Sequence, residues 1–138
     1  MRKFAAALAT ILFTSLTAWA GSPIATPSEA ARKFVEAITQ RKYLEAINSI
    51  PELKEKQTDI DQFSSKLDKF IEVYGGVDHF DLIREESGGT SLLRQKYVIF
   101  YKKGFGVIEF RFFRHQDGWH LSSVDYNFGE NGQEALWK

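Results

Sequence analysis

The apolar side chains change their spacing at Gly75-Gly76, and this change constrains the fold more than any other feature of the sequence. Before these glycines, apolar residues recur every three or four positions, which is typical of helices. After them, apolar and polar residues alternate, which is typical of half-buried strands. The chain has 138 residues, a length that suits one domain and leaves no room for two separate cores. The sequence therefore predicts an α+β domain with its helices first and its strands afterwards.

Three helices are predicted before the glycines. The first begins at residues 26–29, where a threonine cap, a proline and a glutamate form a capping box. The second is predicted over 42–49 and is ended by Pro51, because proline breaks a helix interior. The third has Thr58 as its cap and ends at Gly75-Gly76, since glycine tolerates the backbone conformation found at helix ends.

Four strands are predicted after the glycines. They cover residues 77–87, 92–103, 105–115 and 119–128. Each connection contains glycine and is short enough to force antiparallel neighbours, so the strands form a meander. Residues 129–138 are predicted to be a short tail that brings one aromatic ring back onto the domain.

The turn positions predict how the strands pair. A three-residue loop at 116–118 pairs Phe112 with Ser122, and a turn at Gly104-Phe105 pairs Tyr97 with Phe112. One face of the sheet then carries mostly aromatic and aliphatic side chains and no Asp or Glu, and we expect the helices to cover it. The other face mixes charged and apolar residues.

Residues 1–20 match a secretory signal peptide. They have a short positive start at Arg2-Lys3, an apolar stretch, and Ala18-Trp19-Ala20 directly before Gly21. The apolar stretch is shorter than the roughly 20 residues that a membrane-spanning helix needs, so we expect cleavage and not an uncleaved anchor. The predicted location is the bacterial periplasm, with full secretion as the alternative.

The mature chain is expected to be a single α+β domain over 21–138, with its core at about 27–128 and no later segment able to span a membrane. The full chain has 18 basic and 18 acidic residues. This balance argues against nucleic-acid binding, because no basic excess is available for phosphates. The chain has no Cys, which excludes disulfides and thiolate metal sites. We assign no catalytic residue, metal or cofactor from the sequence.

Aromatic residues make up 14% of the chain, and many of them fall on the face that the helices should cover. These rings are either plain core or the lining of a pocket for a small apolar ligand. The candidate pocket consists of rings with two polar side chains towards one edge: Tyr97, Tyr101, Phe110, Phe112, Arg114, His120 and Tyr126.

Two further candidates involve histidine. His115 and His120 flank the turn that contains Asp117, which suggests either a metal site or an exposed polar hairpin end. On the first strand, His79 and Asp81 should point to the same side. They form either an acid–base pair or, more simply, a surface group in which Asp81 pairs with Lys96 on the next strand.

Two motifs resemble the nuclear-transport-factor-2-like superfamily over about residues 27–128. They are Phe63-x3-Leu67-x2-Phe70 with Gly75-Gly76, and Gln116-Asp117-Gly118-Trp119-His120-Leu121. The resemblance implies three helices packed on a curved sheet that forms a cone. The superfamily includes ketosteroid isomerase, polyketide cyclases, dehydratases and secreted binding modules, so it does not fix the function. Its enzymes commonly place an Asp or His with a Tyr in the open end of the cone, and this chain matches no particular catalytic set.

The sequence thus predicts an exported, non-catalytic module that binds a small apolar ligand or a protein partner, with an isomerase or cyclase type of enzyme as the alternative. We expect the outer sheet face to bury against a second copy or another exported protein. That contact would use the apolar residues Val98, Phe100, Phe113 and Leu121. Alternatively, the tail with Leu136 and Trp137 folds across this face and covers it.

Overall fold

The structure is a computed structural model that describes Pro23, Ile24 and residues 26–55 and 59–138. The predicted signal peptide lies outside the described residues. The described helices are α1 (Pro27–Thr39), α2 (Tyr43–Asn48), α3 (Pro51–Glu55), α4 (Ile60–Tyr74) and α5 (Glu130–Trp137). The strands are β1 (Val77–Gly88), β2 (Leu92–Tyr101), β3 (Gly104–His115) and β4 (Gly118–Phe128).

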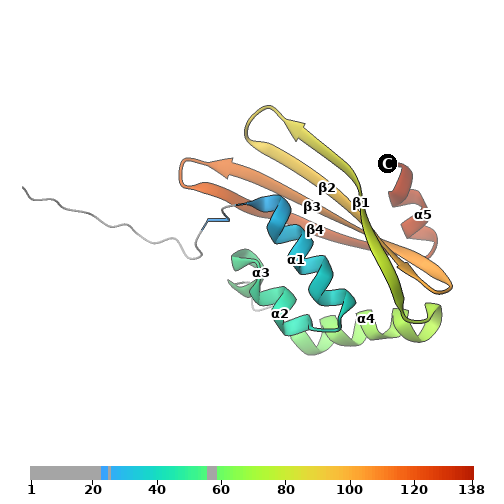
Figure 1. Ribbon diagram of the computed structural model, residues 1–138. Coiled ribbons are helices and arrows are strands. Elements are labelled where there is room, and N and C mark those ends of the chain that lie inside the picture. Colours follow the sequence, from blue (N-terminus) through green and yellow to red (C-terminus); the bar gives the residue numbers. More distant parts are fainter. Residues whose placement is uncertain (1–22, 25, 56–58) are drawn as a thin grey trace, which may run out of the picture.

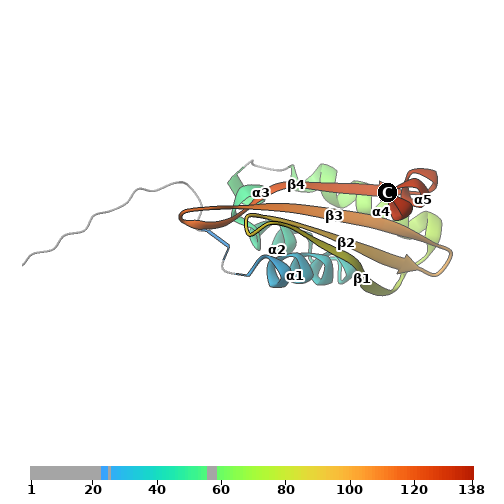
Figure 2. The same ribbon diagram turned by 90° about the horizontal axis from the view of Figure 1, so that it is seen from above.

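The strands form one antiparallel sheet in the order β1-β2-β3-β4. Helices α1 to α4 precede the sheet and pack on one of its faces, whereas α5 follows β4 and lies against the other (Figure 1). The same long strands are seen from above in Figure 2. The α+β class and the four-stranded meander are confirmed. The prediction of three helices is wrong, because the described part of the chain has five, one of them after the sheet.

The extra N-terminal helix, α3, forms because Pro51 is its first residue and not the end of α2. Proline is favoured at this position, since its fixed backbone angle suits a helix start and its missing N–H needs no partner there. At α4 the cap is Asp59, whose side chain accepts hydrogen bonds from the backbone of Asp61 and Gln62. The predicted cap, Thr58, lies outside the described residues. At α1, Pro27 is in the expected place, but Thr26 makes no side-chain cap bond.

The hydrophobic core lies between α1, α2 and α4 and the inner face of the sheet, which is the face turned towards these helices. Phe34 of α1 and Phe110 of β3 are fully buried at its centre, with ring centroids 5.6 Å apart. Helix α4 contributes Phe70, which stacks on Phe128 of β4 with a centroid distance of 3.6 Å. Aromatic contacts thus join the helices to both middle and edge strands.

The turn between β2 and β3 lies two residues earlier than expected. Tyr101 pairs with Gly104, so Lys102 and Lys103 form the loop, and the predicted pairing of Tyr97 with Phe112 is wrong. The backbone N–H of Lys103 donates to the carbonyl of Tyr74 at 2.7 Å, and α4 therefore helps to place the turn. Because the shift is an even number of residues, the side chains stay on the predicted faces.

Each edge strand contains a bulge that changes which side chains face the helices. In β1 the pairing breaks between Leu82 and Arg84, leaving Ile83 without a partner. In β4, Arg111 pairs with Ser123 but Phe112 pairs with Leu121, so Ser122 is the extra residue and the predicted pairing of Phe112 with Ser122 is wrong. A bulge reverses the alternation beyond it.

The prediction that Leu121 lies on the outer face is wrong, because the bulge in β4 turns this side chain to the inner face. Leu121 belongs to the buried core on the inner face. Val98 does lie on the outer face, but it is only 2% exposed. Helix α5 lies on this face and covers part of it, as the alternative with the C-terminal tail proposed. Trp137, however, remains 81% exposed, and no ring from the tail docks on the domain.

Candidate functional site

The rings of the predicted pocket are brought together, and they lie in the core. Tyr97, Tyr101, Phe110 and Phe112 are all buried on the inner face. Burial raises the pKa of Tyr101 to about 12, and burial also raises the pKa of Tyr126. These hydroxyls stay protonated over the physiological range, so the rings act as neutral groups.

The other two predicted pocket residues lie away from the rings, at the end of the β3–β4 hairpin. Arg114 is exposed and lines a surface hollow with Asp117 and Gly118. His120 is partly buried and stacks on Phe113, with ring centroids 5.5 Å apart. The seven predicted residues therefore form two groups: a core of five rings and a polar hairpin end.

The inner face also contains a polar group that the sequence did not predict. Gln95 is fully buried, and its side-chain amide donates to Ser28 Oγ at 3.0 Å and to Glu85 Oε2 at 2.6 Å. Glu85 reaches this face because it follows the bulge at Ile83. The expectation that no carboxylate lies on this face is therefore wrong.

His120 joins the hairpin to α3. Its Nδ1 lies 3.1 Å from Glu52 Oε1 and its Nε2 lies 2.9 Å from Asp117 Oδ1. The hydrogen bond with Asp117 is the main cause that raises the pKa of His120 and lowers that of Asp117. Among the described residues, no group of three His, Cys, Asp or Glu side chains is arranged to hold a metal ion. The arrangement thus fits a link between two elements.

This link predicts a pH-dependent stability. The pKa of His120 is raised above 6.5 on folding. The stability that this side chain contributes is therefore fully present below pH 6.5 and is lost as the pH rises through the folded-state pKa. The contribution of Asp117, whose pKa is lowered from 3.8, is lost as the pH falls through its folded-state pKa. We expect His120→Asn to destabilise the protein most between these two limits, as measured by urea unfolding at several pH values.

His115→Asn is the matched control, since His115 is exposed at the same hairpin and its ring contacts Phe113. A pH profile of unfolding that His120→Asn leaves unchanged would contradict the link.

On the first strand, His79 and Asp81 do point to the same side, with His79 Nε2 3.7 Å from Asp81 Oδ2. His79 is also bonded to Asp78 at 2.9 Å. The predicted pair of Asp81 with Lys96 is wrong, because Arg84 lies opposite Lys96 and Val98 lies opposite Asp81. These exposed groups form a surface cluster at the sheet edge.

A tyrosine–aspartate pair that the sequence analysis missed lies between α2 and α4. The Tyr43 hydroxyl donates to Asp68 Oδ1 at 2.6 Å, and Arg41 Nη2 lies 3.0 Å from the same oxygen. Burial raises the pKa of Tyr43, so this phenol is a weak proton donor. The hollow beside the pair, of about 840 Å³, is lined by residues from 41–49 and 60–64. The pair fastens the two helices together.

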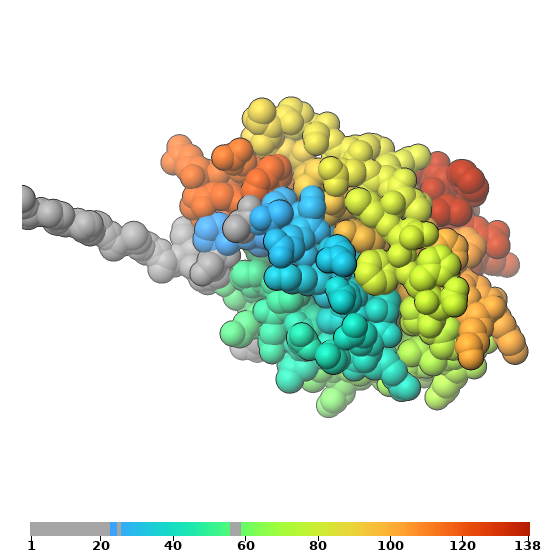
Figure 3. All heavy atoms as spheres, in the orientation of Figure 1, coloured from blue at the N-terminus to red at the C-terminus, as the bar shows by residue number. Residues whose placement is uncertain are grey.

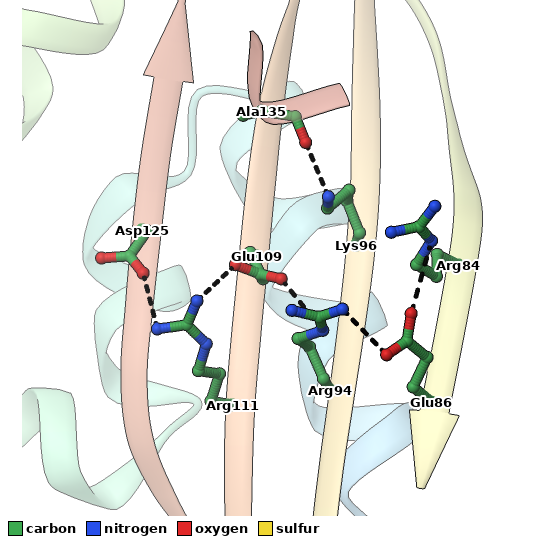
Figure 4. A network of polar contacts seen from close by, with 8 residues as sticks. All are labelled: Arg84, Glu86, Arg94, Lys96, Glu109, Arg111, Asp125 and Ala135. Atoms are coloured by element: carbon green, nitrogen blue, oxygen red, sulfur yellow. Dashed lines mark hydrogen bonds and ion pairs between the residues drawn. The ribbon is translucent and has the colours of Figure 1, made fainter. Parts of the chain in front are cut away.

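The outer face of the sheet holds the largest polar network among the described residues (Figure 4). Arg94 on β2 contacts Glu86 on β1 at 2.8 Å and Glu109 on β3 at 3.3 Å. The network spans all four strands, and we call it the charge row; its members are Arg84, Glu86, Arg94, Glu109, Arg111 and Asp125. Isolated surface ion pairs add little stability, but a network fixes the positions of its side chains.

Lys96 separates the charge row from the part of the outer face under α5. It is 3% exposed, and its Nζ donates to the backbone carbonyl of Ala135 at 2.6 Å. Ala135 lies in the last turn of α5, where carbonyl groups lack helical partners and a positive charge is favourable. Burial lowers the pKa of Lys96, and nearby Glu109 opposes this change. Lys96 thus holds α5 against the sheet.

At the other end of the outer face, apolar side chains remain accessible. Leu92 is 58% exposed and pairs across the strands with half-buried Phe113. Beside them lies a hollow of about 270 Å³, whose lining includes Leu92 and two members of the charge row, Arg94 and Arg111. This end of the sheet combines an apolar surface with the fixed charges of the row.

The layers described above define an α+β fold of the cone type. The sequence matches no described protein family and no curated protein. Among solved structures, the fold is similar to a protein from Thiobacillus denitrificans, provisionally described as a calcium/calmodulin-dependent protein kinase type II association domain. The TM-score is 0.50 at 9% sequence identity, covering 80% of this chain and 100% of that chain.

A cystatin-like protein from Ruminococcus gnavus gives a TM-score of 0.43 at 17% identity, covering 94% of this chain and 49% of that chain. The first likeness shows the fold alone, which is of the nuclear-transport-factor-2-like type. No helix in the described ranges is long and apolar enough to cross a membrane.

Proposed function

We propose that the chain is an exported, non-catalytic module that binds a partner protein on the outer face of its sheet, at the end away from α5. The observation that carries this proposal is the hollow at this end of the sheet, which exposed Leu92 lines together with Arg94 and Arg111 of the charge row. Protein interfaces commonly place an apolar anchor side chain in such a hollow and surround it with polar groups. The proposed partner therefore presents an apolar side chain within a polar surface.

The inner face gives less support to the small-ligand alternative. The ring of Phe34 contacts Phe110 and Tyr126 in the space between helices and sheet, with centroid distances of 5.6 and 6.4 Å. Core side chains thus occupy the region where an apolar ligand would lie. The isomerase or cyclase alternative would need an acid–base pair that faces a substrate. The tyrosine–aspartate pair gives little support for this role, because the Asp68 carboxylate already accepts hydrogen bonds from Tyr43 and Arg41.

The proposal predicts that Leu92→Ser with Phe113→Ser abolishes retention of the partner. The exported protein is immobilised, after mass spectrometry confirms that it begins at Gly21, and is exposed to a periplasmic extract. The control variant is Leu44→Ser with Val73→Ser, which removes two exposed apolar side chains from the helices. We expect one protein to be retained by the wild type and the control and lost from the first variant, and then to bind again when purified.

Retention that is equal for all three proteins contradicts the proposal. So does a small molecule that native mass spectrometry finds bound to the wild type and to the Leu92/Phe113 variant alike, because that result places the binding site elsewhere.

A further inference from the structure

The two edges of the sheet differ in how they are covered. At the β4 edge, Ile24 forms a bridge with Trp119, and its N–H donates to the Trp119 carbonyl at 2.8 Å. Strand β1 pairs with β2 on one side, and no described strand pairs with its other side. Its atoms form a yellow-green stripe on the surface in Figure 3. An uncovered strand edge can pair with another strand.

The middle of β1 is apolar and accessible. Leu82 and Ile83 are 44% and 43% exposed, although most large apolar side chains of the sheet are buried. On either side of them the strand is charged, with Asp81 and His79 before and Arg84 and Glu86 after. Charges on an edge strand normally oppose pairing, so their order along the strand decides whether pairing is favourable.

We propose that two copies of the chain pair antiparallel along β1, with a two-fold axis between Leu82 and Ile83. In this register Asp81 of one copy lies opposite Arg84 of the other, and His79 lies opposite Glu86. Leu82 and Ile83 of the two copies meet at the centre. Opposite charges that face each other across antiparallel strands are stabilising, and the two-fold axis makes each pair occur twice.

The bulge at Ile83 is what allows these pairs to meet. Residues directly opposite in an antiparallel sheet point to the same face, whereas residues 81 and 84 of a regular strand point to opposite faces. In β1, Asp81 lies opposite outer-face Val98 and Arg84 lies opposite outer-face Lys96. The bulge between them therefore puts both charges on the outer face, as the proposed pairing requires.

The charge row supports the same partner. Its signs alternate across the sheet from Asp125 on β4 to Glu86 on β1, and Arg84 on β1 is its last member (Figure 4). An acidic side chain next to Arg84, on the far side of the β1 edge, would continue this alternation of charge. Asp81 of a second copy supplies that charge, so the row would continue through one sheet of two copies.

Sedimentation of two charge-reversal variants and of their mixture tests this proposal. The wild type should dimerise with increasing concentration, whereas Asp81→Arg and Arg84→Asp alone should each dimerise on the order of tenfold or more weakly, because each places two like-charge pairs in the contact. An equimolar mixture restores opposite charges in both pairs. We expect it to dimerise about as well as the wild type.

Glu134→Arg and Lys138→Asp at the end of α5 are the matched controls, since they make the same charge changes at an exposed pair on a helix that packs against β3 and β4. They should dimerise like the wild type, alone and mixed. Ile83→Lys provides a second variant, which should remain folded by circular dichroism and be monomeric. A wild type that stays monomeric at every soluble concentration overturns the proposal, as does a mixture that associates no better than its components.

The edge contact is independent of the proposed partner surface. Leu92→Ser with Phe113→Ser should leave the dimer intact, while Asp81→Arg and Ile83→Lys, which lie outside the charge row, should retain the partner protein. A dimer that responds to the Leu92 and Phe113 substitutions but not to the charge reversals overturns the edge contact and places association on the outer face.

Discussion

Replacing Phe110 with alanine is expected to lower the free energy of unfolding by about 3–5 kcal/mol, a large part of the 5–15 kcal/mol typical of a small domain. Phe110 is fully buried, and its ring contacts Phe34 and Tyr97 edge-on at centroid distances of 5.6 and 5.9 Å. The substitution removes apolar burial and leaves a cavity, because helix and sheet cannot both collapse into it. Urea unfolding followed by circular dichroism measures the loss.

Leu92→Ala is the control for this measurement. Leu92 lies on the same sheet but is largely exposed, so its truncation should change the free energy of unfolding by about 0.5 kcal/mol or less. If Phe110→Ala were as mild as this control, the inner face could not be the packed core described above.

Gly106→Ala is expected to destabilise the protein by about 1–3 kcal/mol through overpacking. A β-carbon at Gly106 would collide with the ring of Phe128, its cross-strand partner. That ring cannot easily retreat, because it stacks on Phe70 of α4 at a centroid distance of 3.6 Å. The change should therefore also loosen α4, which thermal unfolding and hydrogen exchange of α4 amides would detect.

Gly76→Ala is the matched control, because a β-carbon there meets no atom within 4 Å. The double variant Gly106→Ala with Phe128→Leu should recover part of the lost stability by making room for the new methyl group. A double variant that is less stable than Gly106→Ala alone would contradict the steric explanation.

Local patterns in the sequence were sufficient to predict the sheet and most of its inner face. The alternation of apolar residues after Gly75-Gly76 and the glycines in the turns fix four antiparallel neighbours. The features that these patterns did not predict depend on tertiary contacts. The position of the β2–β3 turn is set partly by hydrogen bonds to the end of α4, such as that from the Lys103 N–H to the Tyr74 carbonyl. The pattern of residues within one strand cannot predict such a bond.

The bulges and α5 were missed for different reasons. A bulge at Ser122 leaves the composition of β4 unchanged and becomes visible only when its partners on β3 are known. Helix α5 is short and contains Asn131 and Gly132, which are poor helix formers. Packing on the sheet stabilises it: a β-carbon at Gly132 would approach the carbonyl oxygen of Asn127 to 3.0 Å.

The candidate site was predicted only in part. Rings such as Tyr97 lie on the inner face as predicted, whereas His120, predicted to lie at the edge of the same pocket, lies at the hairpin end away from them. Its partner Glu52 lies 68 residues away in the sequence, which no spacing rule could connect. The charge row was missed because its members are spread over four strands, and the contact of Glu86 with Arg94 depends on where the turn between β1 and β2 lies.

The two bulges also determine where the length of this chain can change. Ile83 is an extra residue in the middle of β1, which has a second irregularity between Val77 and His79, and Ser122 is the extra residue of β4. Deleting either Ile83 or Ser122 would remove its bulge while leaving every other side chain on its present face. A single deletion elsewhere in these strands would turn the residues between it and the bulge from core to solvent. Each edge strand thus has a bulge at which evolution can add or remove a residue without exchanging the two faces of the sheet, at the cost only of the local bend.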